Sequence, residues 1–264
     1  MKSKGVSKLK LSNNLSIDNI INSYKRRGYY GQQLDVIRQG LERGFDVSIY
    51  DDKRFDHRQM HEIFTGLRRN LDVSLFANVK YSFTLMGYIS QALSHGVHRD
   101  KLAAYLDDTA YDKYQLNQIF MGLCDDLDVS KFDSFKYEAA QMNEIRTGLV
   151  NGVDTTPYVD ETFNHHQMIE IRKGLEAGLD VSIYANNKFD SLQMVQLRLG
   201  LAKEIDASKY ALTRLSNVEM QFVRDALEKG IKPDLLLKEG LRYHEMKDIH
   251  NKIVANKASE RFVV

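Results

Sequence analysis

The sequence predicts an all-α solenoid, and three observations support this prediction. A methionine or leucine recurs at almost constant spacing along the 264 residues. The apolar residues around it follow the i, i+3, i+7 spacing of one helix face. The chain contains only two prolines, and no stretch of useful length alternates apolar and polar residues as a strand does. Because each short repeat can bury its apolar face only against its neighbours, we expect the repeats to stack in a line.

The repeat is defined by the recurring residue, which we number position 0. Successive copies are 26 residues apart, except for one interval of 30. Position 0 is occupied by Leu34, Met60, Met86, Leu116, Met142, Met168, Met194, Met220 and Met246. Copies at an almost fixed period predict a solenoid of nine units over residues 29–254.

The first part of each repeat has the pattern of one longer helix. An aromatic residue and a helix N-cap residue precede it, as in Phe163 and Asn164. Met168, Ile171 and Leu175 then form one apolar stripe. Glycine or asparagine stands ten residues after position 0 in six repeats, which is typical of a left-handed C-cap. The sequence therefore predicts a helix of about 13 residues that ends at this cap.

The second part of the repeat predicts a short helix of one to two turns. Its motif is Asp-Val-Ser-x-aromatic, as in Asp180–Tyr184. The Asp is expected to cap the short helix, and the aromatic residue at position +16 to anchor it in the core. Position +6 of the longer helix is a small residue, such as Gly174 or Gly200. Since glycine is unfavourable inside a helix, we expect a neighbouring helix to pack closely there.

Residues 1–28 precede the repeats and differ from them in charge. This segment carries seven basic residues and one acid, whereas the whole chain has a net charge of only +1. The basic residues are Lys2, Lys4, Lys8, Lys10, Lys25, Arg26 and Arg27. The sequence predicts a basic arm with a capping helix at 1–28, the solenoid at 29–254 and a tail at 255–264. The arm is either a solvated tail or a contact for nucleic acid or an acidic partner.

The third repeat is irregular, because it is four residues longer than the others. The segment HGVHRDKLAAYLDDTAYD replaces its Asp-Val-Ser-x-aromatic motif. This segment predicts a longer second helix at about 99–106. A longer helix would change the stacking angle, so we expect the array to bend between the third and fourth repeats.

Composition narrows the function classes. The net charge of +1 argues against a strongly basic nucleic-acid-binding protein. The chain has no apolar run near the length of a transmembrane helix, and its first residues do not form a signal peptide. The single Cys124 excludes an intrachain disulfide framework and fits a reducing compartment. We therefore expect a cytoplasmic protein.

The sequence offers little that could support catalysis or metal binding. His57 and His61 have the spacing of two metal ligands on one helix, but no third ligand can be located. Cys124 has no histidine beside it in the repeat. The phosphate-binding and nucleophile motifs of common enzyme classes are not found. We therefore expect no catalytic residue, no metal and no cofactor.

A column of arginines is the first candidate binding feature. Position +4 is arginine in four consecutive repeats, at Arg146, Arg172, Arg198 and Arg224. Equivalent positions of stacked helices lie about 8–10 Å apart, so these residues should form an Arg ladder. Each arginine either pairs with a nearby acid such as Glu144, Glu170 or Asp180, or belongs to a stripe that binds phosphates or an acidic surface.

Apolar residues at positions that the helical pattern leaves exposed form the second candidate feature. They lie in three adjacent repeats, at Ile169, Val195, Leu199 and Phe222. If the repeats stack, these side chains form one patch, and such patches often mark partner sites. The alternative is that neighbouring short helices cover them.

The consensus F-x-x-x-Q-M-x-x-I-R-x-G-L-x-x-G-L-D-V-S-x-Y-A is strongest at 163–185 and 189–211. It resembles tandem repeats of uncharacterised proteins from Firmicutes phages and conjugative elements. The resemblance covers most of residues 29–254, although residues 81–106 and 241–254 depart from it. The repeat motif itself implies no activity, but the mobile-element origin that the resemblance implies suggests a bacterial host cell and interference with a host defence system, such as an anti-CRISPR role.

Together these features predict a non-enzymatic helical-repeat protein that binds and inhibits or recruits a host protein. The alternative is a nucleic-acid-binding solenoid that uses the basic arm and the Arg ladder. Salt separates the two predictions, because binding to phosphates weakens steeply as the salt concentration rises.

Overall fold

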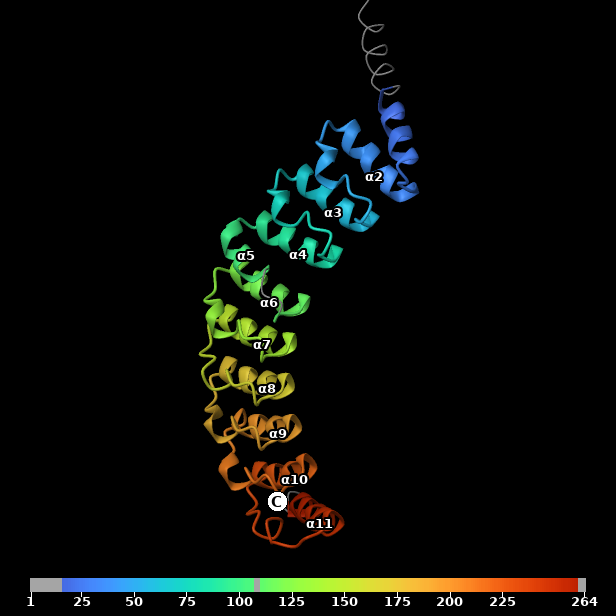
Figure 1. Cartoon of the computed structure of the whole chain (residues 1–264). Coiled ribbons are helices and arrows are strands. Elements are labelled where there is room, and N and C mark those ends of the chain that lie inside the picture. Colours follow the sequence, from blue (N-terminus) through green and yellow to red (C-terminus); the bar gives the residue numbers. More distant parts are fainter. Residues whose placement is uncertain (1–15, 107–109, 261–264) are drawn as a thin grey trace, which may run out of the picture. The chain divides into compact units, whose positions relative to one another are not determined.

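The computed structural model describes residues 16–106 and 110–260, and it contains no strand within these ranges. The all-α prediction is confirmed. Consecutive helices pack against each other as in an α-solenoid, and the chain divides into two compact units, Met1–Asp126 and Leu127–Val264 (Figure 1). The number of nine repeats and the bend at the third repeat remain predictions.

The N-terminal unit begins with a helix at residues 16–26, where the sequence predicts a capping helix. The helices that follow it are α2 (Gly31–Glu42), η1 (Val47–Tyr50), α3 (His57–Arg68), η2 (Val73–Leu75), α4 (Phe83–Ser94), α5 (Arg99–Leu106) and α6 (Lys113–Cys124). Helix α2 packs against α3, α3 against α4 and α4 against α6. The longer second helix predicted in the third repeat is α5, with the expected bounds.

The C-terminal unit holds the repeats with the Arg ladder. Its helices are η3 (Val129–Lys131), α7 (Ala139–Val150), α8 (His165–Glu176), η4 (Val181–Ile183), α9 (Ser191–Leu201), η5 (Ala207–Lys209), α10 (Asn217–Glu228) and α11 (Tyr243–Glu260). Helices α7 to α11 pack in chain order. Helix α11 continues six residues beyond the predicted end of the repeats at residue 254.

The helices begin and end with the predicted caps. Asp56, Asn164 and Asp190 each accept a backbone N–H bond at a helix start. At the other end, Gly178 takes the predicted left-handed conformation with φ of 69°. The N–H of Leu179 then bonds back to the carbonyl of Gly174, which closes the helix.

The second helix of most repeats lies at the lower limit of the predicted one to two turns. It is a single 3₁₀ turn of three or four residues, capped by Asp as expected. Its aromatic residue, such as the fully buried Tyr184, reaches into the core. The hydroxyl of Tyr184 donates to the carbonyl of Glu170 at 3.2 Å.

This aromatic side chain explains the small residue at position +6. A Cβ atom on Gly174 would lie 1.9 Å from the hydroxyl oxygen of Tyr184, which belongs to the same repeat. The same approach occurs at Gly200, where Tyr210 is the neighbour. The close packing predicted at this position is present, and the neighbour is the short second segment of the same repeat.

A buried glutamine links successive repeats. Gln167 accepts the N–H of Asn164 at its own helix start and donates to the carbonyl of Phe189 in the next repeat, at 2.6 Å. Gln141 and Gln193 make the same pair of bonds. Because both ends of each amide are satisfied, a polar side chain can be buried in the core.

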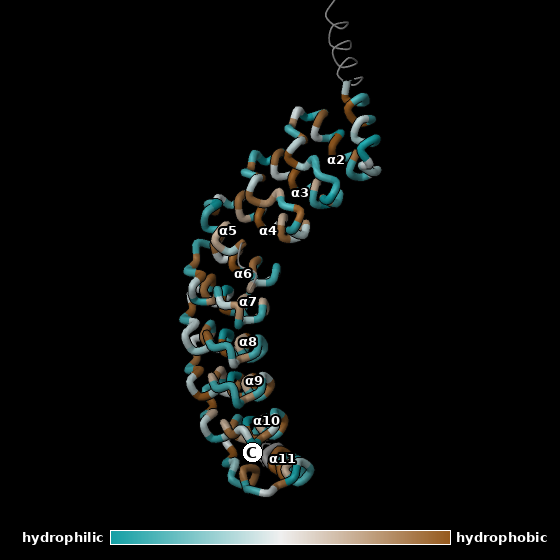
Figure 2. Tube along the Cα trace, viewed as in Figure 1, coloured by the Kyte–Doolittle hydropathy of each residue, from teal (hydrophilic) through white to brown (hydrophobic). Residues whose placement is uncertain are grey.

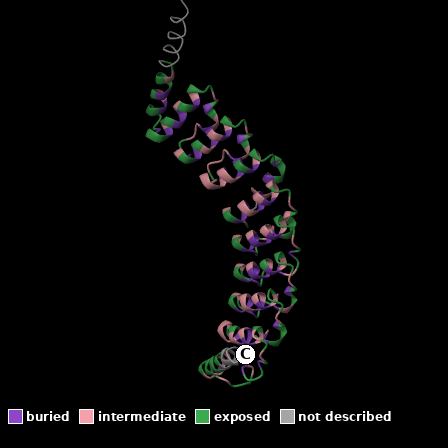
Figure 3. Ribbon diagram, turned by 180° about the vertical axis from the view of Figure 1, so that it is seen from behind, coloured by how far each residue is buried: buried purple, intermediate pink, exposed green. Residues whose placement is uncertain are grey.

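The core lies between adjacent helices. Met168, Ile171 and Met194 are fully buried, as their stripe positions predict. Hydrophobic segments recur in every helix of each unit (Figure 2), and buried residues recur along the helices while the connecting loops are largely exposed (Figure 3). Each helix therefore presents a buried side to its neighbours and another side to solvent.

Candidate binding face of helices α7 to α10

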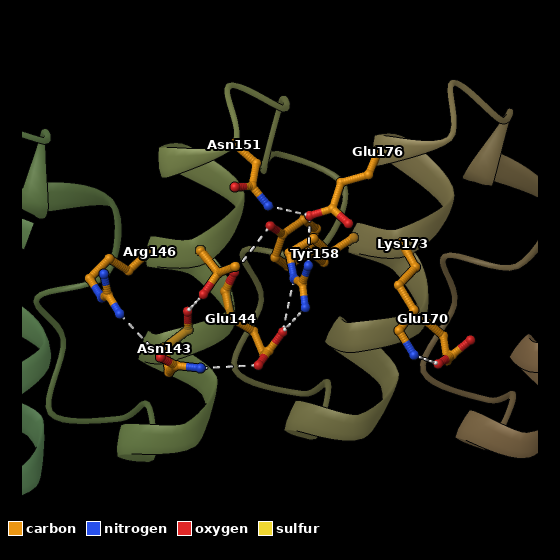
Figure 4. A network of polar contacts seen from close by, with 10 residues as sticks. Asn143, Glu144, Arg146, Asn151, Tyr158, Glu170, Lys173 and Glu176 are labelled. Atoms are coloured by element: carbon orange, nitrogen blue, oxygen red, sulfur yellow. Dashed lines mark hydrogen bonds and ion pairs between the residues drawn. The ribbon is translucent and has the colours of Figure 1, made fainter. Parts of the chain in front are cut away.

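Two arginines of the ladder form ion pairs between helices. Arg172 on α8 contacts Glu144 on α7 at 2.9 Å, and it also pairs with Glu176 at 2.6 Å. Arg198 on α9 contacts Glu170 on α8 at 2.8 Å. These are the partners that the structural alternative for the ladder predicts, although Asp180 is not among them. Figure 4 shows Glu144 reaching from α7 toward α8, which carries Glu176.

The ion pairs of Arg172 and Arg198 are largely buried, so water screens their charges only weakly. The side chains of Arg172 and Glu144 are 14% and 10% exposed. Burial alone would lower the pKa of Arg172, but the hydrogen bonds that it donates to Glu176 and Glu144 raise it. Glu170 also forms an ion pair with Lys173 at 3.0 Å, so its carboxylate contacts two cations, Lys173 and Arg198. Charges of Arg172 and Arg198 are thus balanced within the fold.

The other two arginines of the ladder each contact a residue on their own helix. Arg146 donates to the amide oxygen of Asn143 at 3.4 Å, on its own helix. Arg224 is 9% exposed, and its Nε atom has no hydrogen-bond partner. Its contact with Asp225 is long, at 3.4 Å.

Helices α7 to α10 share a solvent-facing surface, which we call the outer face. It consists of positions −2, +1 and +5, which lie opposite the buried stripe on a helix of 3.6 residues per turn. All of its residues are exposed or half-exposed. They are Ala140, Asn143, Thr147, His166, Ile169, Lys173, Leu192, Val195, Leu199, Val218, Gln221 and Asp225.

Helix α9 carries apolar residues both on its buried side and on the outer face. Met194 and Leu197 are fully buried, while Leu192, Val195 and Leu199 form an i, i+3, i+7 stripe on the outer face. Leu192 is 57% exposed. A helix whose only role is to pack in the stack needs one apolar stripe, so the second stripe needs another explanation.

The structure places three of the four predicted patch residues on the outer face. Ile169, Val195 and Leu199 are half-exposed there. Phe222 lies instead at the packed side of α10, where its ring stacks on His250 of α11 at 4.7 Å between centroids. The sequence pattern missed Leu192, although its spacing to Val195 was the available signal.

The described part of the basic N-terminal segment is partly engaged within the fold. Arg27 donates two hydrogen bonds to Asp51, and Tyr29 donates a third at 2.5 Å. Burial alone would raise the pKa of Asp51, but these bonds hold it below its ordinary value. Lys25 and Arg26 are exposed, and Lys2, Lys4, Lys8 and Lys10 lie outside the described residues.

The remaining chemical candidates are not assembled into a site. Within the residues that the structure describes, no three His, Cys, Asp or Glu side chains are grouped to hold a metal ion. Cys124 lines a crevice of about 80 Å³ between α4 and α6, together with His95 and Asp125. Burial and the charge of Asp125 raise the pKa of this thiol, which disfavours the reactive thiolate at neutral pH.

Comparisons with protein-family models, curated proteins and solved structures found no match. None of the helices in the described ranges is long and apolar enough to cross a membrane.

Proposed function

We propose that the chain is a non-enzymatic helical-repeat protein that binds a partner protein through the outer face of α7 to α10. The observation that carries this proposal is the apolar stripe on the outer face of α9, in which Leu192 is 57% exposed and Val195 and Leu199 are half-exposed. Exposed apolar patches on a rigid stack favour protein contacts, since covering them removes apolar surface from water.

The charges of this face favour a protein partner over nucleic acid. Only Lys173 and Asp225 are charged among the outer-face residues. The guanidinium groups of Arg172 and Arg198, which could have contacted phosphates, are held by Glu144 and Glu170. Nucleic-acid binding draws on unpaired cations that release counterions. The resemblance to mobile-element repeats makes a bacterial host protein, such as a defence component, the class of partner that we propose.

The test is an affinity purification from a host lysate with the whole chain and two variants, followed by a binding measurement with the purified partner. Val195→Asp with Leu199→Asp should abolish capture, because both changes place charge on the stripe. Leu235→Asp is the matched control, since Leu235 is 64% exposed but lies in the turn before α11. Equal capture by all three proteins would contradict the proposal. Binding to nucleic acid that falls steeply with salt would favour the alternative.

A further inference from the structure

The contact between α9 and α10 differs from the two preceding contacts in the stack. In the two preceding contacts, a glutamate at position +2 forms an ion pair with the arginine at position +4 of the next helix. These pairs are Glu144–Arg172 and Glu170–Arg198. The equivalent residues on α9 and α10 are Gln196 and Arg224. A neutral amide therefore stands where the chain has twice placed a carboxylate.

Arg224 is a buried cation that lacks a short hydrogen bond, although its charge also acts on Glu228 one turn along α10. It is 9% exposed, its Nε atom has no hydrogen bond, and its contact with Asp225 measures 3.4 Å. Charge-assisted hydrogen bonds in proteins are about 2.7–2.9 Å long. The other carboxylate oxygen of Asp225 lies 3.7 Å from His250, so this one acid is shared between two neighbours. Burying a guanidinium without close acceptors is unfavourable.

Gln196 also has a buried polar atom without a hydrogen-bond partner, which in this case is an acceptor. Its Oε1 atom is buried and has no hydrogen-bond partner. Moving this amide aside for an incoming group therefore breaks no hydrogen bond at that oxygen, and its Nε2 group can donate to an acceptor. Gln196 lies four residues after Leu192 and three before Leu199 on α9, so it borders the apolar stripe.

We propose that Arg224 and Gln196 form a receptor for a carboxylate, supplied by an acidic side chain of the partner that covers Val195 and Leu199. This inference rests on the proposed function. A carboxylate is favoured over a phosphate because carboxylates occupy the equivalent place in the two preceding contacts. The partner segment therefore combines apolar side chains with one Asp or Glu.

The receptor can be tested without the partner. The Nε–H resonances of the arginine side chains are followed by NMR in the full chain while sodium acetate is added, against sodium chloride at equal ionic strength. A saturable, acetate-specific shift is expected at Arg224 and not at Arg172 or Arg198, which already hold glutamates. Absence of that shift at Arg224 would overturn the inference.

Two matched variants make the test specific. Gln196→Glu supplies the carboxylate from within the chain, so it should raise the melting temperature and remove the acetate response of Arg224. Glu170→Gln recreates the same arrangement one contact earlier and should give Arg198 an acetate response. An acetate response of Arg224 that persists unchanged in Gln196→Glu would contradict the assignment of the site.

Once the partner is purified, Gln196→Glu should weaken its affinity for the chain about tenfold to a hundredfold, because hydrogen bonds to charged groups contribute about 1.5–3 kcal/mol. Unchanged binding by this variant, together with loss of binding in Val195→Asp with Leu199→Asp, would overturn the receptor and leave the proposed function standing. Unchanged binding by both variants would remove the proposed function as well.

Discussion

The pairing of a glycine with a tyrosine inside one repeat makes a sharp prediction about stability. Gly174→Ala places a Cβ atom 1.9 Å from the hydroxyl oxygen of Tyr184 and 2.8 Å from a methyl group of Val181. The tyrosine is fully buried and bonded to the carbonyl of Glu170. It can move away only by losing this bond and its packing.

The expected loss can be estimated from two opposing effects. Overpacking a well-packed core costs about 1–3 kcal/mol. Alanine is favoured over glycine inside a helix by up to about 1 kcal/mol. We therefore expect Gly174→Ala to lower the free energy of unfolding by up to about 2 kcal/mol, whereas helix propensity alone would raise it.

The chain itself suggests the compensating change. Where position +6 is alanine, position +16 is leucine, as in Ala92 with Leu102 and Ala226 with Leu236. All four of these side chains are buried. The double variant Gly174→Ala with Tyr184→Leu should thus be more stable than the sum of the two single changes predicts, by about 1 kcal/mol or more.

Denaturant unfolding of the four proteins, followed by the helical circular dichroism signal, measures this coupling. Gly152→Ala is not a suitable comparison, because Gly152 has a positive φ of 71°. Strictly additive effects, or a Gly174→Ala protein more stable than the parent, would refute the steric explanation.

Three further predictions concern single residues. Glu204 takes the left-handed conformation with φ of 57°, so Glu204→Gly should raise the free energy of unfolding by about 1 kcal/mol, measured by denaturant titration. Gln193→Leu should lower it by about 1–3 kcal/mol, because the N–H of Asp190 and the carbonyl of Leu215 lose their partner. The pKa of Asp51 is depressed, so its stabilising effect is present above its unfolded pKa of about 4 and is lost as the pH falls through the lower folded value. The melting temperatures of the parent and Asp51→Asn should therefore differ at pH 7 and converge in acid.

Much of the fold could be predicted because its signals are local. An N-cap such as Asn164 and a left-handed glycine such as Gly178 act on residues within a few positions, so their types reveal them. The period of the repeat then shows which helices are neighbours. The pairs Glu144–Arg172 and Glu170–Arg198 were predictable for the same reason, since equivalent positions of stacked helices align.

The features that the sequence does not reveal depend on the direction of side chains in space. The pattern shows that Gly174 is small, but not that Tyr184 of the same repeat points at it. Likewise, the Gln-Met pair marks the repeat, yet only the structure shows Gln167 bonded to the carbonyl of Phe189.

The central claim is that the apolar stripe on the outer face of α9 contacts a protein partner. The most direct measurement is the affinity of the purified partner for the parent chain, for Val195→Asp with Leu199→Asp, and for the control Leu235→Asp, with melting curves that establish folding. We expect binding to be lost only in the first variant, with all three proteins folded. Equal affinity of all three folded proteins for the partner would contradict the claim.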